Sequence, residues 1–225
     1  MTTLLLALVG AHAATPIEAV PLGSTWSYLD DGVDPGPTWV EASFDDALWS
    51  AGAAPLGYGI FGGTVVGYGP DPANVYVTTW FRSTFDVVDP ALQTGLTMEL
   101  QRDDGAVIYL NGVEIHRSNL VSPSTSATLA TTDITGIDES ALESISVDPT
   151  LLVAGPNQLA VEVHQAAVDS DDLAFDLSVT TWTGPPAIIR GPYLQNVTPT
   201  SAVIQWRTDL PTIGEVVIDG RTLTG

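Results

Sequence analysis

The stretch RDDGAVIYLNGVEIHRSNL, residues 102–120, carries the strongest fold signal in the chain. Asn111-Gly112 lies in its middle, and a type I′ turn needs the positive φ that these two residue types tolerate best. A two-residue turn at this point places Ile108 opposite Ile115 on an apolar face. The stretch therefore predicts an antiparallel hairpin over residues 106–117.

The same stretch holds two aspartates, a histidine and two arginines, so a catalytic or metal site is the alternative interpretation. The predicted register sets His116 opposite Val107, with no second histidine or carboxylate aligned beside it. Asp103-Asp104-Gly105 precedes the strand as a turn. Turn geometry accounts for these residue types and favours a structural hairpin, although Asp103 and Asp104 could still bind a cation or shape the loop.

Strands of period two recur along the chain, while no long stretch keeps a helical period. Within 172–182, alternate apolar residues share one face, and we expect Asp176 and Ser178 on the other face to be wet. A short helix is plausible only within 138–152. The pattern is typical of an all-β sandwich or barrel, and its clearest strands are at 76–87, 95–100, 106–117, 157–165 and 172–182.

The net charge of the chain limits the classes of partner that it can bind. The 225 residues include 27 acidic side chains and only 6 basic ones, all arginine, for a formal net charge of -21. Such a surface repels nucleic acid and anionic lipid, whereas cations, neutral sugars or another protein fit it better. Cysteine is absent, which excludes disulfides and thiolate metal sites.

Residues 1–13 have the features of an export signal. An apolar run from Leu4 to Val9 precedes Ala11-His12-Ala13, a small-x-small pattern that predicts cleavage after Ala13. The usual basic n-region is missing, so an ordinary N-terminal segment is the alternative. No later segment approaches the roughly 20 apolar residues of a membrane span, and we expect an exported protein, secreted or periplasmic, without a span.

The residue inventory disfavours catalysis. Beyond the signal only His116 and His164 remain, and no GxSxG motif is present. Two histidines cannot supply the converging ligands of a two-metal hydrolase. His164 alternates with Val161 and Val163, and we interpret it as a hydrogen-bonded structural residue or part of a ligand surface. In so acidic a chain, neighbouring carboxylates carry no weight for glycoside hydrolysis.

The loop LDDGVDPG, residues 29–36, is the candidate metal site. Asp30, Asp31 and Asp34 supply oxygen ligands on a glycine-rich backbone, which structural calcium favours. The acidic residue that closes an EF-hand is absent, and plain Asx turns explain the same residues. The stretch DSDD at 169–172 is a weaker version of this pattern.

Two glycine-rich loops, 56–63 and 65–72, match no phosphate-binding pattern, because no lysine is available and no helix follows. Aromatic residues in and near these loops could form a platform for sugar rings. Alternatively the aromatics seal one end of the sandwich. The residues in question are Trp39, Trp49, Tyr58, Phe61 and Tyr68.

A domain boundary is predicted at 184–189, where Pro185 and Pro186 cannot donate to a strand ladder. Further strands follow at 201–207 and 215–219, the first with Ala202, Ile204 and Trp206 on one face. Because chains below roughly 40 residues rarely form a core alone, we expect 190–225 to be an incomplete domain.

Several separated motifs resemble, in this order, those of a galactose-binding-like jelly-roll module found in large secreted bacterial proteins. The resemblance covers about residues 20–183 and implies a β-sandwich domain over 14–183 without catalytic activity, presumed to bind carbohydrate or a cell-surface glycan. The motifs are WSYLDDGVDPGPTWVEASFDDALWSAGAAPLGYG (26–59), TTWFRSTFDV (78–87), RDDGAVIYLNGVEIHRSNL (102–120), DPTLLVAGPNQLAVEVHQ (148–165) and SDDLAFDLSV (170–179).

The stretch IIRGPYLQNVTPTSAVIQWRTDLPTIGEVVIDG, 188–220, is similar to the start of the fibronectin type III-like N-terminal domain of purple acid phosphatases and related metallophosphoesterases. In that family a catalytic domain follows, whose GD and GNH motifs hold two metals; neither motif occurs here. We expect a non-catalytic accessory module from a truncated protein of that type. The alternatives are the front part of an active secreted phosphoesterase and a spacer without a ligand.

Overall fold

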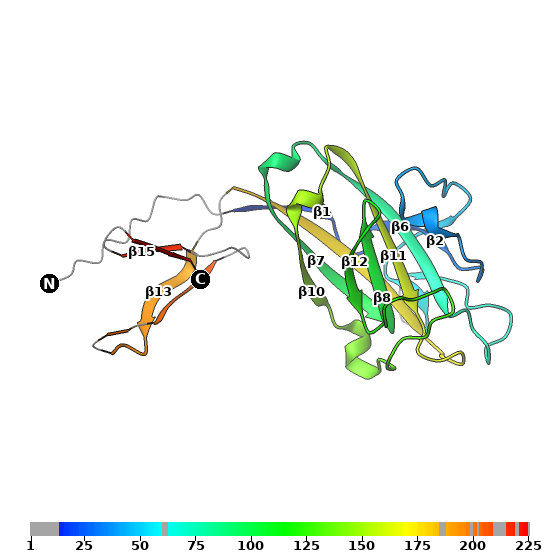
Figure 1. The fold of residues 1–225 in the computed structure, drawn as a ribbon. Helices are drawn as coiled ribbons and strands as arrows, with labels where there is room; N and C mark the ends of the chain where they lie inside the picture. The colour runs from blue at the N-terminus through cyan, green and yellow to red at the C-terminus, as the bar shows by residue number, and fades with distance from the viewer. Residues whose placement is uncertain are drawn as a thin grey trace.

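The computed structural model describes residues 14–59, 63–184, 188–198, 200–201, 203–208, 215–218 and 221–224. Residues 14–184 form a β-sandwich of two sheets, and β13–β16 lie beside it as two separate strand pairs (Figure 1). The described residues contain no α-helix, only four short 3-10 turns. The predicted all-β sandwich is confirmed. None of the described helical segments is long and apolar enough to cross a membrane.

Two sheets of six strands each make the sandwich. The first runs in the order β10 (Glu143–Val147), β7 (Gln93–Asp103), β12 (Leu173–Thr183), β4 (Leu56–Tyr58) and β5 (Thr64–Val65), with β1 (Thr15–Val20) also paired to β12. The second runs in the order β3 (Ser50–Ala53), β2 (Thr25–Leu29), β6 (Thr78–Val87), β11 (Gly155–His164), β8 (Gly105–Leu110) and β9 (Val113–Ser118). All pairs are antiparallel except β4 with β5.

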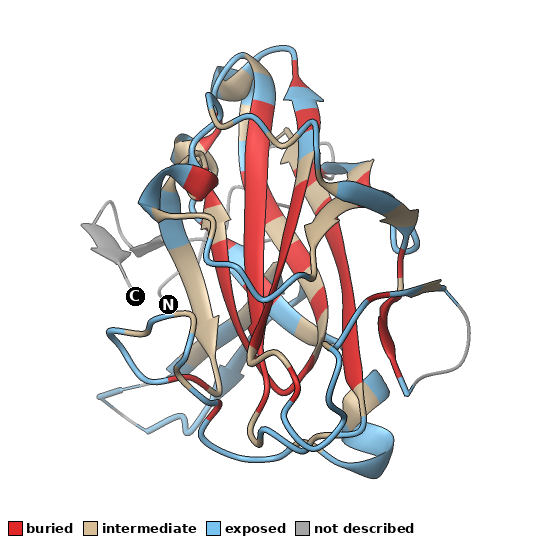
Figure 2. Ribbon diagram, turned by 90° about the vertical axis from the view of Figure 1, so that its right-hand side faces the viewer, coloured by how far each residue is buried: buried red, intermediate tan, exposed pale blue. Residues whose placement is uncertain are grey.

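The core lies between the sheets, and the buried residues of the central strands form continuous bands in Figure 2. Alternation along β12 puts Leu173, Phe175 and Leu177 into this core. Their neighbours on the other face are not wet, contrary to expectation: Asp176 and Ser178 are 5% and 8% exposed. The turn before β2 covers this face, and Asp176 accepts a 2.9 Å hydrogen bond from the Gly23 amide there.

The outer face of the second sheet is also covered. Trp39, in the 3-10 turn η1 (Pro37–Val40), packs with Trp80 and Ala160 into a second apolar cluster. Trp49 packs against this cluster, so these tryptophans cover a sheet face instead of sealing one end. Arg82 is buried beneath them and meets Asp46 Oδ2 at 2.9 Å. The Arg82 guanidinium also donates to the carbonyl oxygens of Trp39 and Glu41. These hydrogen bonds and the Asp46 carboxylate satisfy the buried charge and hold the segment 39–46 against the sheet.

The predicted hairpin is present with its turn at Asn111-Gly112, where φ is 52° and 82°. Its register differs from expectation by one residue, because Ile108 lies opposite His116 and not opposite Ile115. The extra residue, Ile115, forms a bulge and packs its half-buried side chain against the core. The bulge shifts the pairing of β8 by one residue from Ile108 onward, while Ile115 keeps the core contact that the expected register also gave it.

Residues 138–152 contain a strand, Glu143–Val147, and no α-helix where the sequence left a short helix open. Here β10 lies between two 3-10 turns, η3 (Gly136–Ser140) and η4 (Pro149–Leu151). Asp148 caps the second turn by accepting from the amide of Thr150 at 2.9 Å. The remaining 3-10 turn, η2 (Pro90–Leu92), is capped by Asp89 in the same way.

Beyond residue 184, β13 (Ile188–Gln195) pairs with β14 (Val203–Thr208), and β15 (Glu215–Ile218) pairs with β16 (Arg221–Thr224). Ile204 and Trp206 are half-buried between exposed neighbours, as predicted, while Ala202 lies outside the described residues. No described side chain of β13 or β14 is buried. The signal predicted for 1–13 and prolines 185 and 186 of the linker also lie outside the described residues.

Candidate functional site

The loop at 29–36 holds the three aspartates predicted as calcium ligands. Asp31 Oδ1 accepts from the amide of Val33 at 2.9 Å, and Asp34 Oδ1 accepts from the amide of Gly36 at 2.8 Å. Both are the Asx turns named as the alternative. Asp30 points elsewhere and accepts from the backbone amide of Gly67.

The three carboxylates therefore accept hydrogen bonds from different partners. Asp30 ties two loops together, and Asp34 Oδ2 reaches further to accept the Ser126 hydroxyl at 2.7 Å. Nowhere in the described part of the chain do three Asp, Glu or His side chains gather as metal ligands. Calcium at Asp30, Asp31 and Asp34 stays a prediction.

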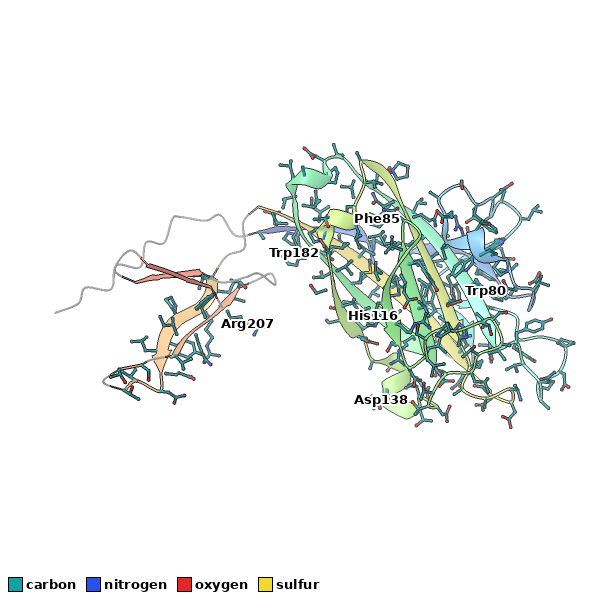
Figure 3. All side chains as sticks on the ribbon, in the orientation of Figure 1. Trp80, Phe85, His116, Asp138, Trp182 and Arg207 are labelled. Atoms are coloured by element: carbon teal, nitrogen blue, oxygen red, sulfur yellow. The ribbon has the colours of Figure 1, made fainter. Side chains whose placement is uncertain are left out.

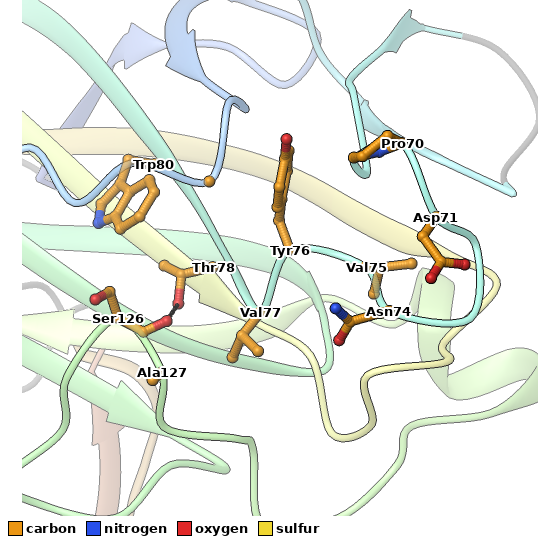
Figure 4. A pocket seen from close by; sticks show the side chains of 11 residues that line it. Pro70, Asp71, Asn74, Val75, Tyr76, Val77, Thr78, Trp80, Ser126 and Ala127 are labelled. Carbon is orange, nitrogen blue, oxygen red and sulfur yellow. Dashed lines mark hydrogen bonds between the residues drawn. The ribbon is translucent and has the colours of Figure 1, made fainter.

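The loop borders an open pocket of about 440 Å³ at one end of the sandwich (Figure 4). In the close-up, the Tyr76 ring stands at its centre with Trp80 to one side and Pro70 and Asp71 to the other. Across the pocket, Thr78 donates its hydroxyl hydrogen to the Ser126 carbonyl at 2.8 Å. The lining consists of Gly32, Pro70, Asp71, Asn74, Val75, Tyr76, Val77, Thr78, Trp80, Ser126 and Ala127.

Two glycines make room for the Tyr76 ring. A Cβ on Gly32 would lie 2.4 Å from Tyr76 Cδ1, and one on Gly69 would lie 3.2 Å from Tyr76 Cε1. Both glycines also have positive φ, at 75° and 104°. Gly32 of the 29–36 loop and Gly69 of the 65–72 loop therefore make room for an aromatic ring. Sequence reasoning missed this role because it assigned Tyr76 to the strand 76–87. The strand begins only at Thr78.

The pocket combines an aromatic wall with polar groups at its rim. Asp71 and Asn74 are exposed, and Asp71 Oδ1 accepts from the amide of Ala73 at 3.0 Å. A second Asp71 oxygen and the Asn74 amide group add acceptors and donors beside the half-buried Tyr76. This arrangement suits a polar ligand with an apolar ring face, since the ring can stack while hydroxyls are hydrogen-bonded.

Beneath the pocket, His164 contacts Thr78, but the geometry does not activate a nucleophile. His164 Nδ1 lies 3.0 Å from Thr78 Oγ1 and 2.8 Å from the carbonyl oxygen of Thr128. Because a carbonyl oxygen only accepts, Nδ1 carries the hydrogen and cannot take a proton from Thr78. His164 is fully buried and hydrogen-bonded, in agreement with its predicted structural role.

His116 has a carboxylate partner that the sequence did not indicate. Its Nε2 lies 2.9 Å from Glu143 Oε1, and Arg102 Nε lies 3.4 Å from the other oxygen of the same carboxylate. Glu143 comes from β10, a strand that sequence periodicity did not identify. The contact bridges the two sheets at their edge strands and gives His116 a structural role.

No protein-family model and no curated protein matches the chain significantly. Solved structures do match: a β-glucuronidase from glycoside hydrolase family 2 aligns at a TM-score of 0.50 and 15% identity over 90% of this chain and 22% of that one. A β-glucuronidase of an uncultured Clostridium species gives 0.48 and 16% over 92% and 36%. A β-glycosidase from Bacteroides vulgatus gives 0.47 and 13% over 89% and 25%.

The likeness concerns the fold. At 15% identity, the alignment with the first of these enzymes shows a shared β-sandwich fold and nothing more. This chain spans between 22% and 36% of the length of those three enzymes. The comparisons give no support to the purple acid phosphatase resemblance of 188–220, which stays a prediction.

Proposed function

We propose that residues 14–184 are a non-catalytic carbohydrate-binding module that holds a neutral glycan in the pocket around Tyr76. The observation that carries this proposal is the pocket itself, of about 440 Å³, with the Tyr76 ring set between glycine-rich loops and polar side chains on its rim. A sugar offers apolar C–H faces to the ring and hydroxyls to Asp71 and Asn74.

The charge of the chain supports a neutral ligand. At a net charge of -21, an anionic polysaccharide or a phosphate-bearing polymer is repelled before it reaches the pocket. Asp71 at the rim adds a local negative charge. Neutral hexoses are not repelled by this charge, and their hydroxyls can donate hydrogen bonds to the Asp71 carboxylate.

The accessory character of the module, its export and its parent protein belong to the same proposal. The fold likeness to parts of glycoside hydrolases supports a carbohydrate-related role. Export rests on the signal features of residues 1–13, and attachment to a metallophosphoesterase rests only on the resemblance of 188–220. If no sugar binds, a spacer without a ligand is the remaining interpretation of the sandwich.

Replacement of the ring tests the proposal. A glycan array followed by calorimetric titration of the best neutral ligand should show binding to the full chain that Tyr76→Ala abolishes, because the stacking surface is removed. Tyr76→Phe should keep most of the affinity. Tyr193→Ala, a partly exposed tyrosine on β13, is the matched control and should bind like the wild type.

Two outcomes would contradict the proposal. One is an array on which no neutral glycan binds at millimolar concentration. The other is a glycan that binds Tyr76→Ala as well as it binds the wild-type chain, since the ligand would then occupy another surface.

A further inference from the structure

One wall of the pocket around Tyr76 belongs to a single loop, residues 119–132. Its two ends are joined, because the backbone oxygen of Asn119 accepts a hydrogen bond from the amide of Thr131 at 2.9 Å. A loop of this length with its ends joined is an Ω-loop, a kind of segment that often carries function. The residues of this loop that line the pocket are Ser126 and Ala127.

Apolar packing does not hold the middle of this loop. Leu120 and Ala130, near its two ends, are buried at 8% and 7% exposure, but none of the residues between them is buried. A segment that removes no apolar side chain from water gains little free energy from packing. The position of the wall therefore depends on hydrogen bonds.

Two side chains of the second sheet hold the loop from its buried side. Thr78 Oγ1 donates to the Ser126 carbonyl oxygen at 2.8 Å. His164 Nδ1 donates to the Thr128 carbonyl oxygen at the same distance of 2.8 Å. Thr78 and His164 are direct partners in the pairing of β6 with β11, so their side chains lie on one face of the sheet. Both are buried, and the wall therefore rests on two donors from neighbouring central strands.

The other side-chain anchors of the loop are at the surface or near its start. Asp34 accepts from the Ser126 hydroxyl in a hydrogen bond that is exposed to water. Arg117 donates to the Val121 carbonyl oxygen and to the Ser124 hydroxyl, ahead of the residues that line the pocket. Water competes for exposed hydrogen bonds. The lining part of the loop therefore depends mainly on the two buried donors.

Packing alone does not explain a histidine at position 164. Its Nε2 is buried without a hydrogen-bond partner, and Glu162 Oε2 lies 3.6 Å from it. A buried polar atom that lacks a partner destabilises the folded state. A leucine would cover the same sheet face and leave no nitrogen unpaired. The advantage of the imidazole therefore lies in its other nitrogen, Nδ1, which holds Thr128.

We propose that His164, together with Thr78, is a positioning residue of this pocket and fixes the wall at residues 126–128 before a sugar arrives. A preformed wall raises affinity, because less conformational freedom is lost on binding. His164 is fully buried and does not line the pocket, so its effect on binding passes through the loop. The inference rests on the proposed function for the identity of the ligand, whereas the position of the loop can be measured with no ligand at all.

The test is amide hydrogen exchange in the full chain carrying His164→Leu. Exchange should become roughly tenfold faster at the Thr128 amide, whose own hydrogen bond to the Thr125 carbonyl oxygen lies within the loop. The increase should be much smaller at the Thr131 amide and at the amides of β6 and β11. A histidine that only stabilises the core would instead speed exchange equally in the loop and in these strands.

Further variants separate the lost donor from a general loss of packing. His164→Asn keeps an N–H donor near the place of Nδ1 and should restore slow exchange at Thr128. Thr78→Val removes the second donor with little change of shape and should loosen the same part of the loop. His116→Leu is the matched control, because this histidine, labelled in Figure 3, contacts β10 and not the loop.

The affinity for the neutral glycan that the array selects supplies the functional readout. It should fall roughly five- to tenfold in His164→Leu and recover in His164→Asn. The inference is overturned if His164→Leu leaves exchange at Thr128 unchanged, or if the loop loosens while glycan affinity stays at the wild-type value. An array without any binder would end the proposed function alone, since loop exchange would still decide whether His164 positions the wall.

Discussion

The tripeptide Asp-Asp-Gly occurs twice, at residues 30–32 and at 103–105, and the two copies have opposite environments. In the first copy Asp31 is exposed, and both carboxylates accept from nearby backbone amides. In the second copy both carboxylates are buried and one has no donor at all. Identical local sequence therefore gives ordinary turn residues in a loop and a strongly perturbed carboxyl at a crossing between sheets.

The glycines of the two copies also differ in the atoms that a Cβ would meet at each position. Gly32 has a φ of 75° and lies against the Tyr76 ring. A Cβ on Gly105 would instead lie 2.9 Å from Ala130 Cβ and 3.0 Å from the Asn119 carbonyl oxygen. The first glycine shapes a pocket at the surface, and the second lets two backbones approach each other inside the sandwich.

The largest expected change in the free energy of unfolding is the gain from Asp103→Asn in calcium-free buffer. Because burial and neighbouring carboxylates raise the pKa of Asp103 from 3.8 to about 8, its contribution to stability is full below pH 3.8 and is lost as the pH rises through 8. Each pKa unit is worth about 1.4 kcal/mol. After allowance for relaxation around the charge, the variant should exceed the wild type by about 3 kcal/mol above pH 8.

Urea unfolding at several pH values measures this difference. The gain of Asp103→Asn should vanish below about pH 4, where the wild-type carboxyl is protonated in both states. Asp31→Asn is the matched change in the other copy and should stay within about 0.5 kcal/mol of the wild type. An equal pH dependence in both variants would show that the two copies do not differ.

A second comparison uses two glycines of one loop. Gly32 and Gly36 have nearly equal φ values, 75° and 80°, but a Cβ on Gly36 has nothing within 4 Å. Gly36→Ala should cost about 1 kcal/mol for its backbone, while Gly32→Ala should cost about 2 to 3 kcal/mol because it also displaces Tyr76. Thermal and urea unfolding give both values.

Ligand titration adds a functional check on the same pair. Gly32→Ala should weaken sugar binding, because the ring it displaces is the proposed stacking surface, and Gly36→Ala should not. Equal stability losses in the two variants would mean that Tyr76 rotates freely away from residue 32.

The smallest effect concerns the link between Asp34 and Ser126. Their hydrogen bond of 2.7 Å joins the first loop to the far wall of the pocket but is exposed to water. A double-mutant cycle with Asp34→Ala and Ser126→Ala should give a coupling of about 0.5 kcal/mol. A cycle pairing Asp31→Ala with Ser126→Ala serves as control and should give none, whereas equal coupling in both cycles would refute a direct link.

Periodicity predicted the long strands well. The sequence placed β6, β7, β11 and β12 within a few residues of their observed bounds, because alternation of large apolar side chains is a local signal. Short strands such as β10 and β4 escaped, since three to five residues with glycine or serine carry too little pattern. The bulge at Ile115 also escaped, because no turn residue or glycine within 113–117 marks the extra residue in the sequence.

The candidate sites were predictable only in part. The sequence analysis offered the glycine-rich loops and the aromatic residues near them as a sugar platform or as a seal of the sandwich end. It did not select Tyr76, since nothing in a linear sequence shows that Gly32 and Gly69 flank this ring. Asp103 was interpreted as a turn residue with a possible cation role. Its burial comes from β12 and the 131–140 segment, which are distant in sequence.

The sequence by itself determined the all-β class, the hairpin turn at Asn111-Gly112 and the strongly acidic character, because each depends on residue type and short-range spacing. Tertiary structure alone decided which Asp-Asp-Gly is a loop and which is buried. Burial and the supply of hydrogen-bond donors are properties of segments brought together in space, and those two quantities set the chemistry of a carboxylate.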